Sequence, residues 1–365
     1  MGVKYLFTFM LLILTVGRAL AAIGFRDAVF PEFAISGRAT AMGSAYICKV
    51  DDPASVFYNP AGLGTVRKTH FHFSNFHLET NRDWMKLATT GKLWDAMDGF
   101  FDGLELEGLR KLLLNDRGRV PHLRIQAMPN FTTRYMSIGY LYSRQTRATI
   151  GGAGNSKFEY AKREDHGPYA ALNLSLFGGI FKFGGSAIIL QRKENIGEAD
   201  ANVSFEDTPD RKGTAVIVTG GSRLTLPVTF LPTFSLVVRN MTATTFSGRA
   251  AGPPEKIPQT MDLGFSITPQ IGKIIRVHFE TNYKDIGNRY SDVSTVRKIL
   301  FGMEIDFARA FFIRGGYGDG FGTAGLGIKA QGFEFDLSTY AIDTTTVNYR
   351  GKEDRRFSMT LSWGF

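Results

Sequence analysis

The final stretch of the chain, Phe357-Ser-Met-Thr-Leu-Ser-Trp-Gly-Phe365, alternates between apolar residues and Ser, Thr or Gly up to the last residue. Successive side chains of a β-strand point to opposite faces, so this segment has one apolar face and one polar face. Such a pattern predicts a half-buried strand at the C-terminal end of the sequence.

The same alternation recurs upstream. In 299–307, apolar Ile299, Phe301 and Met303 alternate with Gly302 and Glu304. The segments that show this pattern most clearly are 172–176, 261–268, 275–283, 299–307 and 333–338. Many of the strands reach about ten residues, which is the length of a tilted membrane crossing.

A soluble β-sandwich with its apolar faces inward would show the same period. Strand length and aromatic-rich apolar faces favour a transmembrane antiparallel β-barrel with its apolar faces toward lipid. Phe365 resembles the C-terminal signal that outer-membrane proteins present to the barrel-assembly machinery. We therefore expect an all-β protein of the bacterial outer membrane, with outer-membrane lipid and the assembly machinery as partners.

The N-terminal residues predict a secretory signal peptide over 1–21. Lys4 supplies a positive charge, 5–16 is an apolar and hydroxyl run, and Ala19-Leu20-Ala21 is a small-x-small cleavage pattern. The run of about a dozen residues is too short for a transmembrane helix, which needs about 20. The mature chain is expected to begin near Ala22.

Strand-like segments number fifteen, whereas closed single-chain bacterial barrels have an even number of strands. We predict about 14 strands and regard 156–164 as the weakest candidate. Residues 22–66 carry little alternation and many small residues, which predicts a plug inside a barrel formed by 67–365. Residues 83–115 have amphipathic helical spacing and predict a helical extracellular loop.

The composition excludes several classes of function. The net charge is +9, but the cations alternate with acids and do not form a nucleic-acid-binding patch. Cys48 is the single cysteine, so no internal disulfide forms. His70 and His72 could bind a metal, and a cluster around His278 could be catalytic, but polar lumen side chains explain both better. We predict no enzyme activity, no metal and no cofactor.

Residues 36–64 carry the most specific motif. It contains Arg38-Ala-Thr-Ala-Met-Gly-Ser-Ala45, Asp51-Asp52 and Asn59-Pro-Ala-Gly-Leu63. This combination resembles the N-terminal signature of the FadL/TodX superfamily of outer-membrane transporters, most closely its PorV-like branch. The glycine-rich stretch 314–328 resembles the penultimate hairpins of that branch.

The resemblance implies that the N-terminal segment is a hatch that occludes the barrel. The positions that match its gating element are Asn59, Pro60, Ala61 and Gly62. From the residues alone, the segment could equally be a structural turn, because Asn-Pro favours a turn whatever its role. Asp51 and Asp52 could cap backbone N–H groups or pair with arginines of the wall.

Polar residues on the strands predict an ion-pair network in the lumen. Its expected members are Asp262, Arg276, His278, Glu280, Glu304, Asp306, Arg314 and Glu334. The predicted extracellular loop carries an apolar set, which comprises Trp84, Leu87, Trp94, Phe100 and Phe101. This set could form a packed cap over the barrel mouth or an apolar entry groove for a lipid-like ligand, and the two interpretations are compatible.

Two functions from different classes follow. The first is passive uptake of a hydrophobic small molecule, similar to a long-chain fatty acid, through a hatch-gated lumen. The second is a PorV-like scaffold that binds secreted or surface proteins. A general porin is a third interpretation, which a plug argues against. An apolar pocket beside the hatch would favour transport, and a lumen filled by closed ion pairs would weaken it.

Overall fold

The computed structural model describes residues 33–66, 69–89, 105–151, 156–205, 209–249, 251–272, 274–344 and 350–364. None of the helices in these ranges is long and apolar enough to cross a membrane. The predicted signal peptide, the start of the predicted plug, Trp94, Phe100, Phe101 and Phe365 lie outside the described residues.

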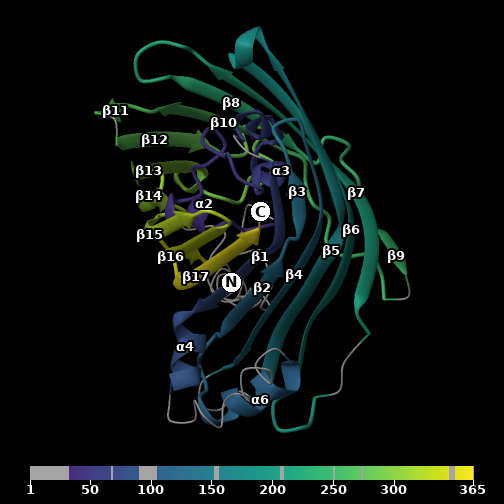
Figure 1. Ribbon diagram of the computed structural model, residues 1–365. Helices are drawn as coiled ribbons and strands as arrows, with labels where there is room; N and C mark the ends of the chain where they lie inside the picture. Colours follow the sequence, from purple (N-terminus) through teal and green to yellow (C-terminus); the bar gives the residue numbers. More distant parts are fainter. Residues whose placement is uncertain are drawn as a thin grey trace, which may run out of the picture.

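Strands make up most of the described chain (Figure 1). They are β1 (His70–Asn81), β2 (His122–Ala127), β3 (Asn130–Thr132), β4 (Met136–Ile150), β5 (Lys157–Leu176), β6 (Phe181–Asp200), β7 (Arg211–Thr225), β8 (Thr233–Arg239), β9 (Ser247–Arg249), β10 (Thr260–Ile267), β11 (Gln270–Ile271), β12 (Ile275–Tyr283), β13 (Ile299–Phe307), β14 (Phe311–Gly318), β15 (Phe321–Ala330), β16 (Phe333–Asp343) and β17 (Glu353–Gly364).

These segments form one closed antiparallel barrel, because β17 pairs with β1 as well as with β16. Three barrel strands are each interrupted and appear as two segments. Segments β2 and β3 pair with the same neighbours, β8 and β9 both pair with β7, and β10 and β11 both pair with β12. The barrel thus has 14 strands, which confirms the predicted fold and strand number.

The two ends of the barrel differ. Turns such as 177–180, 308–310 and 331–332 join the strands at the end where β17 finishes, and long connections such as 82–121 and 240–259 lie at the other. Outer-membrane barrels have short periplasmic turns and longer extracellular loops. The turn end is therefore periplasmic and the loop end extracellular.

The outer face of the wall is apolar. Leu172, Phe301 and Trp363 point outward with 68%, 52% and 59% of their surface exposed, whereas polar residues at inward positions, such as Ser338 and Ser362, are buried. In water such a band would be unfavourable at about 25 cal/mol for each Å² of apolar surface. The band fits the hydrocarbon core of a bilayer, and the protein is an outer-membrane β-barrel.

One strand differs from the prediction. Lys157–Leu176 is a single strand of 20 residues, so the weak candidate 156–164 is real and forms the first half of β5. Within β5, Pro168 lacks the N–H donor that a strand residue gives to its neighbour. In the barrel Gly167 and Pro168 are skipped in the pairing of β5 with β6, while pairing with β4 continues through them.

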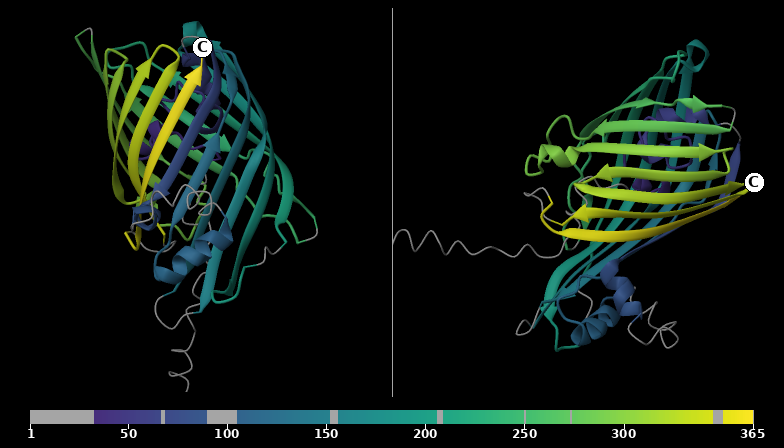
Figure 2. Two further views of the ribbon diagram at one scale, coloured as in Figure 1. Left: turned by 60° about the horizontal axis from the view of Figure 1, so that its bottom comes forward. Right: turned by 90° about the vertical axis from the view of Figure 1, so that its left-hand side faces the viewer.

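Residues 33–66 lie inside the barrel (Figures 1 and 2). They form the short helices α2 (Gly37–Ala41) and α3 (Ser55–Tyr58) and the 3₁₀ helix η1 (Pro60–Thr65). Most of their side chains, including Met42, Tyr46 and Leu63, are fully buried. We call residues 33–66 the hatch, a name that refers here to position alone.

The helical connection 82–121 contains α4 (Arg82–Thr89) and α6 (Leu106–Asn115). In α6, Leu106, Leu109 and Leu113 pack on Phe158 and Tyr160 of β5. These two positions share the strand face of exposed Leu172, which points away from the lumen. Two shorter elements, η2 (Phe177–Gly179) and η3 (Thr295–Lys298), complete the described helices.

The expected cap over the barrel mouth is therefore wrong for α6. The helix covers the outer face of an extension formed by β4–β6 beyond the apolar band (Figures 1 and 2). Amphipathic spacing indicates that a helix has an apolar face but cannot say which face of a sheet that helix will cover. Trp84 and Leu87 lie on α4, and Leu87 joins the same apolar cluster.

Substitution Leu109→Ala should release α6 from this extension without opening the barrel. Truncating a buried leucine costs about 2–5 kcal/mol, which exceeds what holds one short helix. We expect faster proteolysis within 105–120 and unchanged resistance of the barrel. Lys111→Ala, whose side chain is 68% exposed, is the control. Equal cleavage rates in the two variants would contradict the packing described.

Candidate functional site: a two-sided lumen around the hatch

The hatch contacts the backbone of the barrel wall directly at glycine positions. A Cβ atom at Gly184 of β6 would lie 2.1 Å from the carbonyl carbon of Pro60. At Gly221 of β7 it would lie 2.1 Å from Oδ1 of Asn59. No side chain fits at either position, so the start of η1 is seated directly on the wall backbone.

A second seat lies across the lumen. Cβ atoms added at Gly302, Gly316 and Gly318 would lie 2.7, 2.4 and 2.3 Å from backbone atoms of Met42 or Gly43. These wall glycines belong to β13 and β14 and include part of the stretch that the sequence analysis singled out. The hatch therefore rests on wall glycines on opposite sides of the lumen, at Met42-Gly43 and at Asn59-Pro60.

The predicted gating residues hold the bend between α3 and η1. Asn59 Nδ2 donates to the Ile47 carbonyl at 2.8 Å, and Asn59 Oδ1 accepts from the Ala61 N–H at 3.1 Å. Pro60 stands at the first position of η1, where its missing N–H costs nothing. Gly62 packs on Val50, with no room for a Cβ. All four residues are buried.

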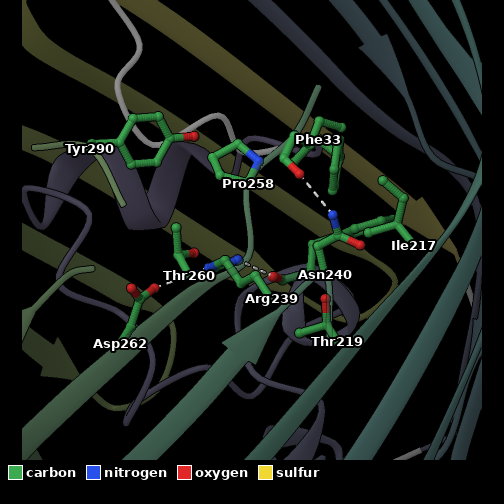
Figure 3. A pocket seen from close by; sticks show the side chains of 11 residues that line it. Phe33, Ile217, Thr219, Arg239, Asn240, Pro258, Thr260, Asp262 and Tyr290 are labelled. Atoms are coloured by element: carbon green, nitrogen blue, oxygen red, sulfur yellow. Dashed lines mark hydrogen bonds and ion pairs between the residues drawn. The ribbon is translucent and has the colours of Figure 1, made fainter. Parts of the chain in front are cut away.

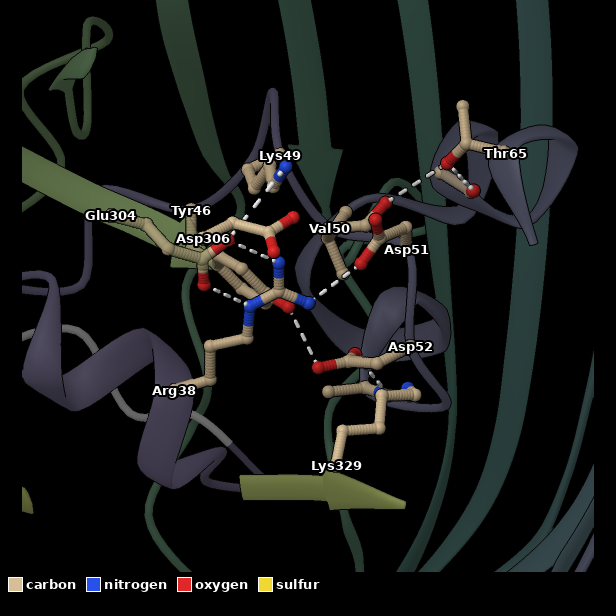
Figure 4. Close-up of polar contacts among 12 residues, drawn as sticks. Arg38, Tyr46, Lys49, Val50, Asp51, Asp52, Thr65, Glu304, Asp306 and Lys329 are labelled. Carbon is tan, nitrogen blue, oxygen red and sulfur yellow. Dashed lines mark hydrogen bonds and ion pairs between the residues drawn. The ribbon is translucent and has the colours of Figure 1, made fainter. Parts of the chain in front are cut away.

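One side of the lumen is ionic (Figure 4). Arg38 donates from Nε and Nη2 to both oxygens of Glu304 at 2.7 Å, and from Nη1 to Asp51 at 2.6 Å. Arg314 reaches the same Glu304 at 2.8 Å and also pairs with Asp336. This buried network joins the hatch to β13, β14 and β16.

The other predicted polar residues also point into the lumen. Glu280 accepts from the N–H groups of Cys48 and Lys49 at 2.8 and 2.9 Å and contacts His278 at 3.0 Å. The remaining four form pairs within the wall: Asp262 with Arg239, Arg276 with Asp306, and Glu334 with Lys329. The network ties down the hatch as well as filling the interior.

The opposite side of the lumen carries an apolar cluster, beside the buried ion pairs of β5 and β6. Inward residues of β4–β7 pack against α3 and η1 and against the extracellular loop residues Phe246 and Ile257. The cluster comprises Ala34, Val56, Phe57, Leu63, Val66, Met128, Leu141, Tyr169, Ala171, Ile188, Leu190, Ala215, Ile217, Phe246 and Ile257. It runs from the loops to η1, and we call it the apolar track.

A cavity opens at the extracellular end of this track (Figure 3). Phe33, Phe57 and Ile217 line one side, and Arg239 and Asp262 line the other. The volume of this cavity is about 30 Å³. The cavity is a narrow seam above the hatch.

Arg239 closes the floor of this seam. Its Nε donates to Asp262 at 3.0 Å, and its Nη1 donates to the Phe57 carbonyl at 2.5 Å, at the end of α3. Its Nη2 lies 3.4 Å from the Tyr58 carbonyl. One guanidinium therefore joins β8, β10 and the hatch.

Sequence reasoning missed Arg239 and the partners of Arg38. Arg38 stands in the recognised motif, but nothing in its spacing indicates Glu304, which is 266 residues away. A second buried cluster was also missed, in which Glu79 accepts from His122, Tyr340 and Arg356 at 2.7, 2.6 and 3.1 Å. Across the described ranges, no three His, Cys, Asp or Glu side chains are placed to hold a metal ion.

Asp52 of the hatch is electrostatically unusual. Burial raises its pKa to about 6, and nearby Glu334 and Asp51 act in the same direction. The Tyr46 hydroxyl donates to its Oδ2 at 2.7 Å, and its Oδ1 accepts from the Ala54 N–H at 2.9 Å. By contrast Asp51 has a lowered pKa, because Arg38 and Lys49 outweigh its burial.

Comparison with solved structures finds the same barrel fold in outer-membrane proteins that are described as hydrocarbon transporters or channels. The toluene transporter TbuX from Ralstonia pickettii is 13% identical, with 92% of this chain and 99% of that chain covered and a TM-score of 0.52. The monoaromatic hydrocarbon channel CymD is 9% identical, covering 92% and 98%, with a TM-score of 0.54. At these identities the likeness is one of fold.

The remaining comparisons give no further information on the fold. The chain covers 60% of CdiB from Acinetobacter baumannii at a TM-score of 0.36, which is too low to carry an argument. No family model and no curated protein sequence matches the chain. The comparisons support the FadL/TodX-type fold expected from the N-terminal motif but do not address the PorV-like branch.

Substitution Arg38→Met should loosen the hatch strongly. Removing one partner of a buried ion pair costs about 3–5 kcal/mol, because the other charge is left unpaired. Lys49 and Arg314 still face Glu304, so we expect about 3 kcal/mol. Denaturant unfolding of the purified barrel measures this. Lys329→Met removes a half-exposed pair and should cost under about 1 kcal/mol. Equal losses would contradict the network.

The raised pKa of Asp52 predicts a stability that falls as pH rises. Between its unfolded value of 3.8 and about 6, the folded state binds the additional proton. The contribution is therefore complete below about pH 4 and is lost as pH passes through 6. Asp52→Asn should raise the unfolding midpoint at pH 7.5 and not at pH 4. A gain of equal size at both pH values would rule out this titration.

Proposed function

We propose, on the premise that this chain has the fold of FadL/TodX-type outer-membrane transporters, that it takes up hydrophobic small molecules by passive diffusion through a hatch-gated lumen. The ligand expected from the sequence is similar to a long-chain fatty acid. The observation that carries the proposal is the apolar track, which runs along β4–β7 from the loops to η1. No covalent step and no energy source are involved.

The entry seam suits a largely apolar ligand. Its carboxylate Asp262 is paired with Arg239, and its amide Asn240 donates to the Ile257 carbonyl at 2.8 Å. Polar groups that are already bonded offer little to an incoming ligand, so binding energy comes from Phe33, Phe57 and Ile217. A water-filled pore would need a continuous polar passage, which the hatch blocks.

Hatch side chains occupy the track as a ligand would. Phe57 stacks edge-on against Tyr169 of β5 with ring centroids 5.1 Å apart, and Leu63 is fully buried in the same cluster. Moving α3 and η1 aside would expose an apolar surface that a hydrophobic molecule could cover instead. Contacts that the ligand makes with this surface replace those lost when α3 and η1 move. The hatch therefore opens only when ligand is present.

The two ends of the hatch are held by different forces. The α2 end is fixed by buried ion pairs of Arg38. The η1 end rests on Gly184 and Gly221 and is held by apolar contacts, with Arg239 bonding the end of α3. Apolar contacts can be exchanged for a ligand and buried ion pairs cannot. We assign movement to 54–66 and anchorage to 36–46.

A protein-binding scaffold was the alternative from the sequence. The ionic side of the lumen is consistent with a permanently closed barrel, but binding a protein partner at the surface does not require an apolar track inside the lumen. Several of its residues, such as Ile217 and Ile257, line the entry seam. The apolar track therefore favours transport.

A disulfide between the hatch and the wall tests this proposal directly. A Cβ built on Gly64 of η1 lies 2.8 Å from Oγ of Ser175 on β5, so Gly64→Cys combined with Ser175→Cys places two thiols against each other between the moving segment and the wall. Uptake of a labelled hydrophobic compound into proteoliposomes should stop in the oxidised double variant and return on reduction. Gly64→Cys alone is the control that cannot form this cross-link. Full uptake through the oxidised protein would overturn the proposed gating.

A further inference from the structure

Two cations face each other across neighbouring strands at the periplasmic mouth. Lys182 of β6 is the direct antiparallel partner of Arg223 of β7, and both belong to the lumen-facing rows of their strands. Like charges directly opposite on one face of a sheet destabilise the pair. Lys182 is only 7% exposed, so water screens this repulsion weakly.

No described carboxylate lies within ion-pair distance of either side chain. Lys182 donates to the Gly179 carbonyl, and Arg223 Nη1 lies 3.3 Å from Oγ1 of Thr65. Inward cations elsewhere are matched with acids, as in Arg192 with Asp165 at 2.6 Å and Arg163 with Glu194 at 2.6 Å. The pair at the mouth is thus a concentration of positive charge with no ion-pair partner among the described residues.

The surroundings supply further donors and the end of the hatch. A Cβ at Gly64 of η1 would lie 2.7 Å from Cδ of Lys182 and 2.8 Å from both Asn173 Nδ2 and Ser175 Oγ. The amide and the hydroxyl can both donate to an anion. These groups sit beside the hatch segment to which movement is assigned above.

An apolar surface lies just outside the same mouth. Phe177, Val228 and Phe230, in the turns that follow β5 and β7, are 79%, 57% and 56% exposed. Phe177 and Phe230 also have positive φ angles of 51° and 69°, where turns favour glycine or asparagine. Bulky apolar residues in exposed, strained positions indicate contact with something apolar.

We propose that Lys182 and Arg223 form a binding site for the anionic head group of an amphiphile, with Ser175 and Asn173 as supporting donors. The apolar chain of that amphiphile follows the turn residues Phe177, Val228 and Phe230. The shared chemistry fits the carboxylate of a ligand leaving the lumen and the phosphate of a periplasmic-leaflet lipid. The inference deepens the proposed function, because it places an exit site for charged hydrophobic ligands beside η1.

Binding at this site would act on the hatch. An anion between the two cations relieves their repulsion and competes with Thr65 for the Arg223 guanidinium. Loss of the Thr65 contact weakens the η1 end and leaves the Arg38 anchor unchanged. A bound head group therefore favours the open hatch, whereas a small anion without an apolar chain binds too weakly to do so.

The experiment compares dodecanoate, dodecanol and acetate on the full-length barrel in nonionic detergent, with affinity taken from the shift of the unfolding midpoint. We expect dodecanoate to bind the wild type about tenfold more tightly than Lys182→Gln/Arg223→Gln, since charge-assisted hydrogen bonds are lost. Dodecanol should bind both equally, and acetate should bind neither. Arg211→Gln/Lys212→Gln, at the opposite end of β7, removes the same charge and should match the wild type.

Without ligand, the neutralised variant should be at least as stable as the wild type, because a repulsive pair is removed. Equal affinity of dodecanoate for wild type and Lys182→Gln/Arg223→Gln would overturn the proposal. In nanodiscs, stabilisation by phosphatidylglycerol that depends on both cations assigns the site to lipid, and its absence assigns the site to the transported ligand. Both assignments presuppose that dodecanoate binding depends on the two cations, and without that dependence the proposal fails.

The test of the head-group site and the test of hydrophobic uptake can fail independently. If the site binds dodecanoate but proteoliposomes take up no hydrophobic compound, the site stands and uptake falls. If uptake proceeds and the two cations make no difference to binding, uptake stands and the site falls.

Discussion

Pairing of β17 with β1 is the contact on which the rest of the structure depends. A membrane offers no partners to unpaired backbone N–H and C=O groups, so the sheet is stable there only if it closes. The seam is reinforced inside the lumen, where buried Glu79 of β1 binds His122, Tyr340 and Arg356 from β2, β16 and β17. Closure fixes a lumen of limited width, and the hatch preceding β1 fills it.

Once the barrel is closed, the division of its interior decides what it can do. Ion pairs of Arg38 and Arg314 hold the hatch on β13–β16. Against β4–β7 the hatch is held mainly by apolar contacts, with single hydrogen bonds such as Ser186 Oγ to the Val56 carbonyl at 2.7 Å. The first interaction is costly to break and the second is exchangeable for a hydrophobic ligand. This asymmetry explains how one plug can be firmly retained and still give way on one side.

Much of the fold could be predicted from the sequence, because alternation of period two is a local property. The strands from β10 to β17 and the inward position of residues such as Glu304 follow from it directly. What local pattern cannot provide is long-range pairing. The contact between Arg38 and Glu304, the seats on Gly184 and Gly316, and the continuity of β5 through Pro168 depend on residues far apart in sequence. Amphipathic spacing in 83–115 predicted helical structure, but the location of α6 outside the barrel depends on how far β4–β6 extend.

The central claim is that the η1 half of the hatch moves in response to a hydrophobic ligand while the α2 half does not. Amide hydrogen exchange on the reconstituted barrel, with and without a hydrophobic ligand, measures this most directly. The account predicts faster exchange across 54–66 when ligand is present and unchanged exchange across 36–46. Unchanged exchange across 54–66 at saturating ligand, or acceleration confined to 36–46, would contradict it.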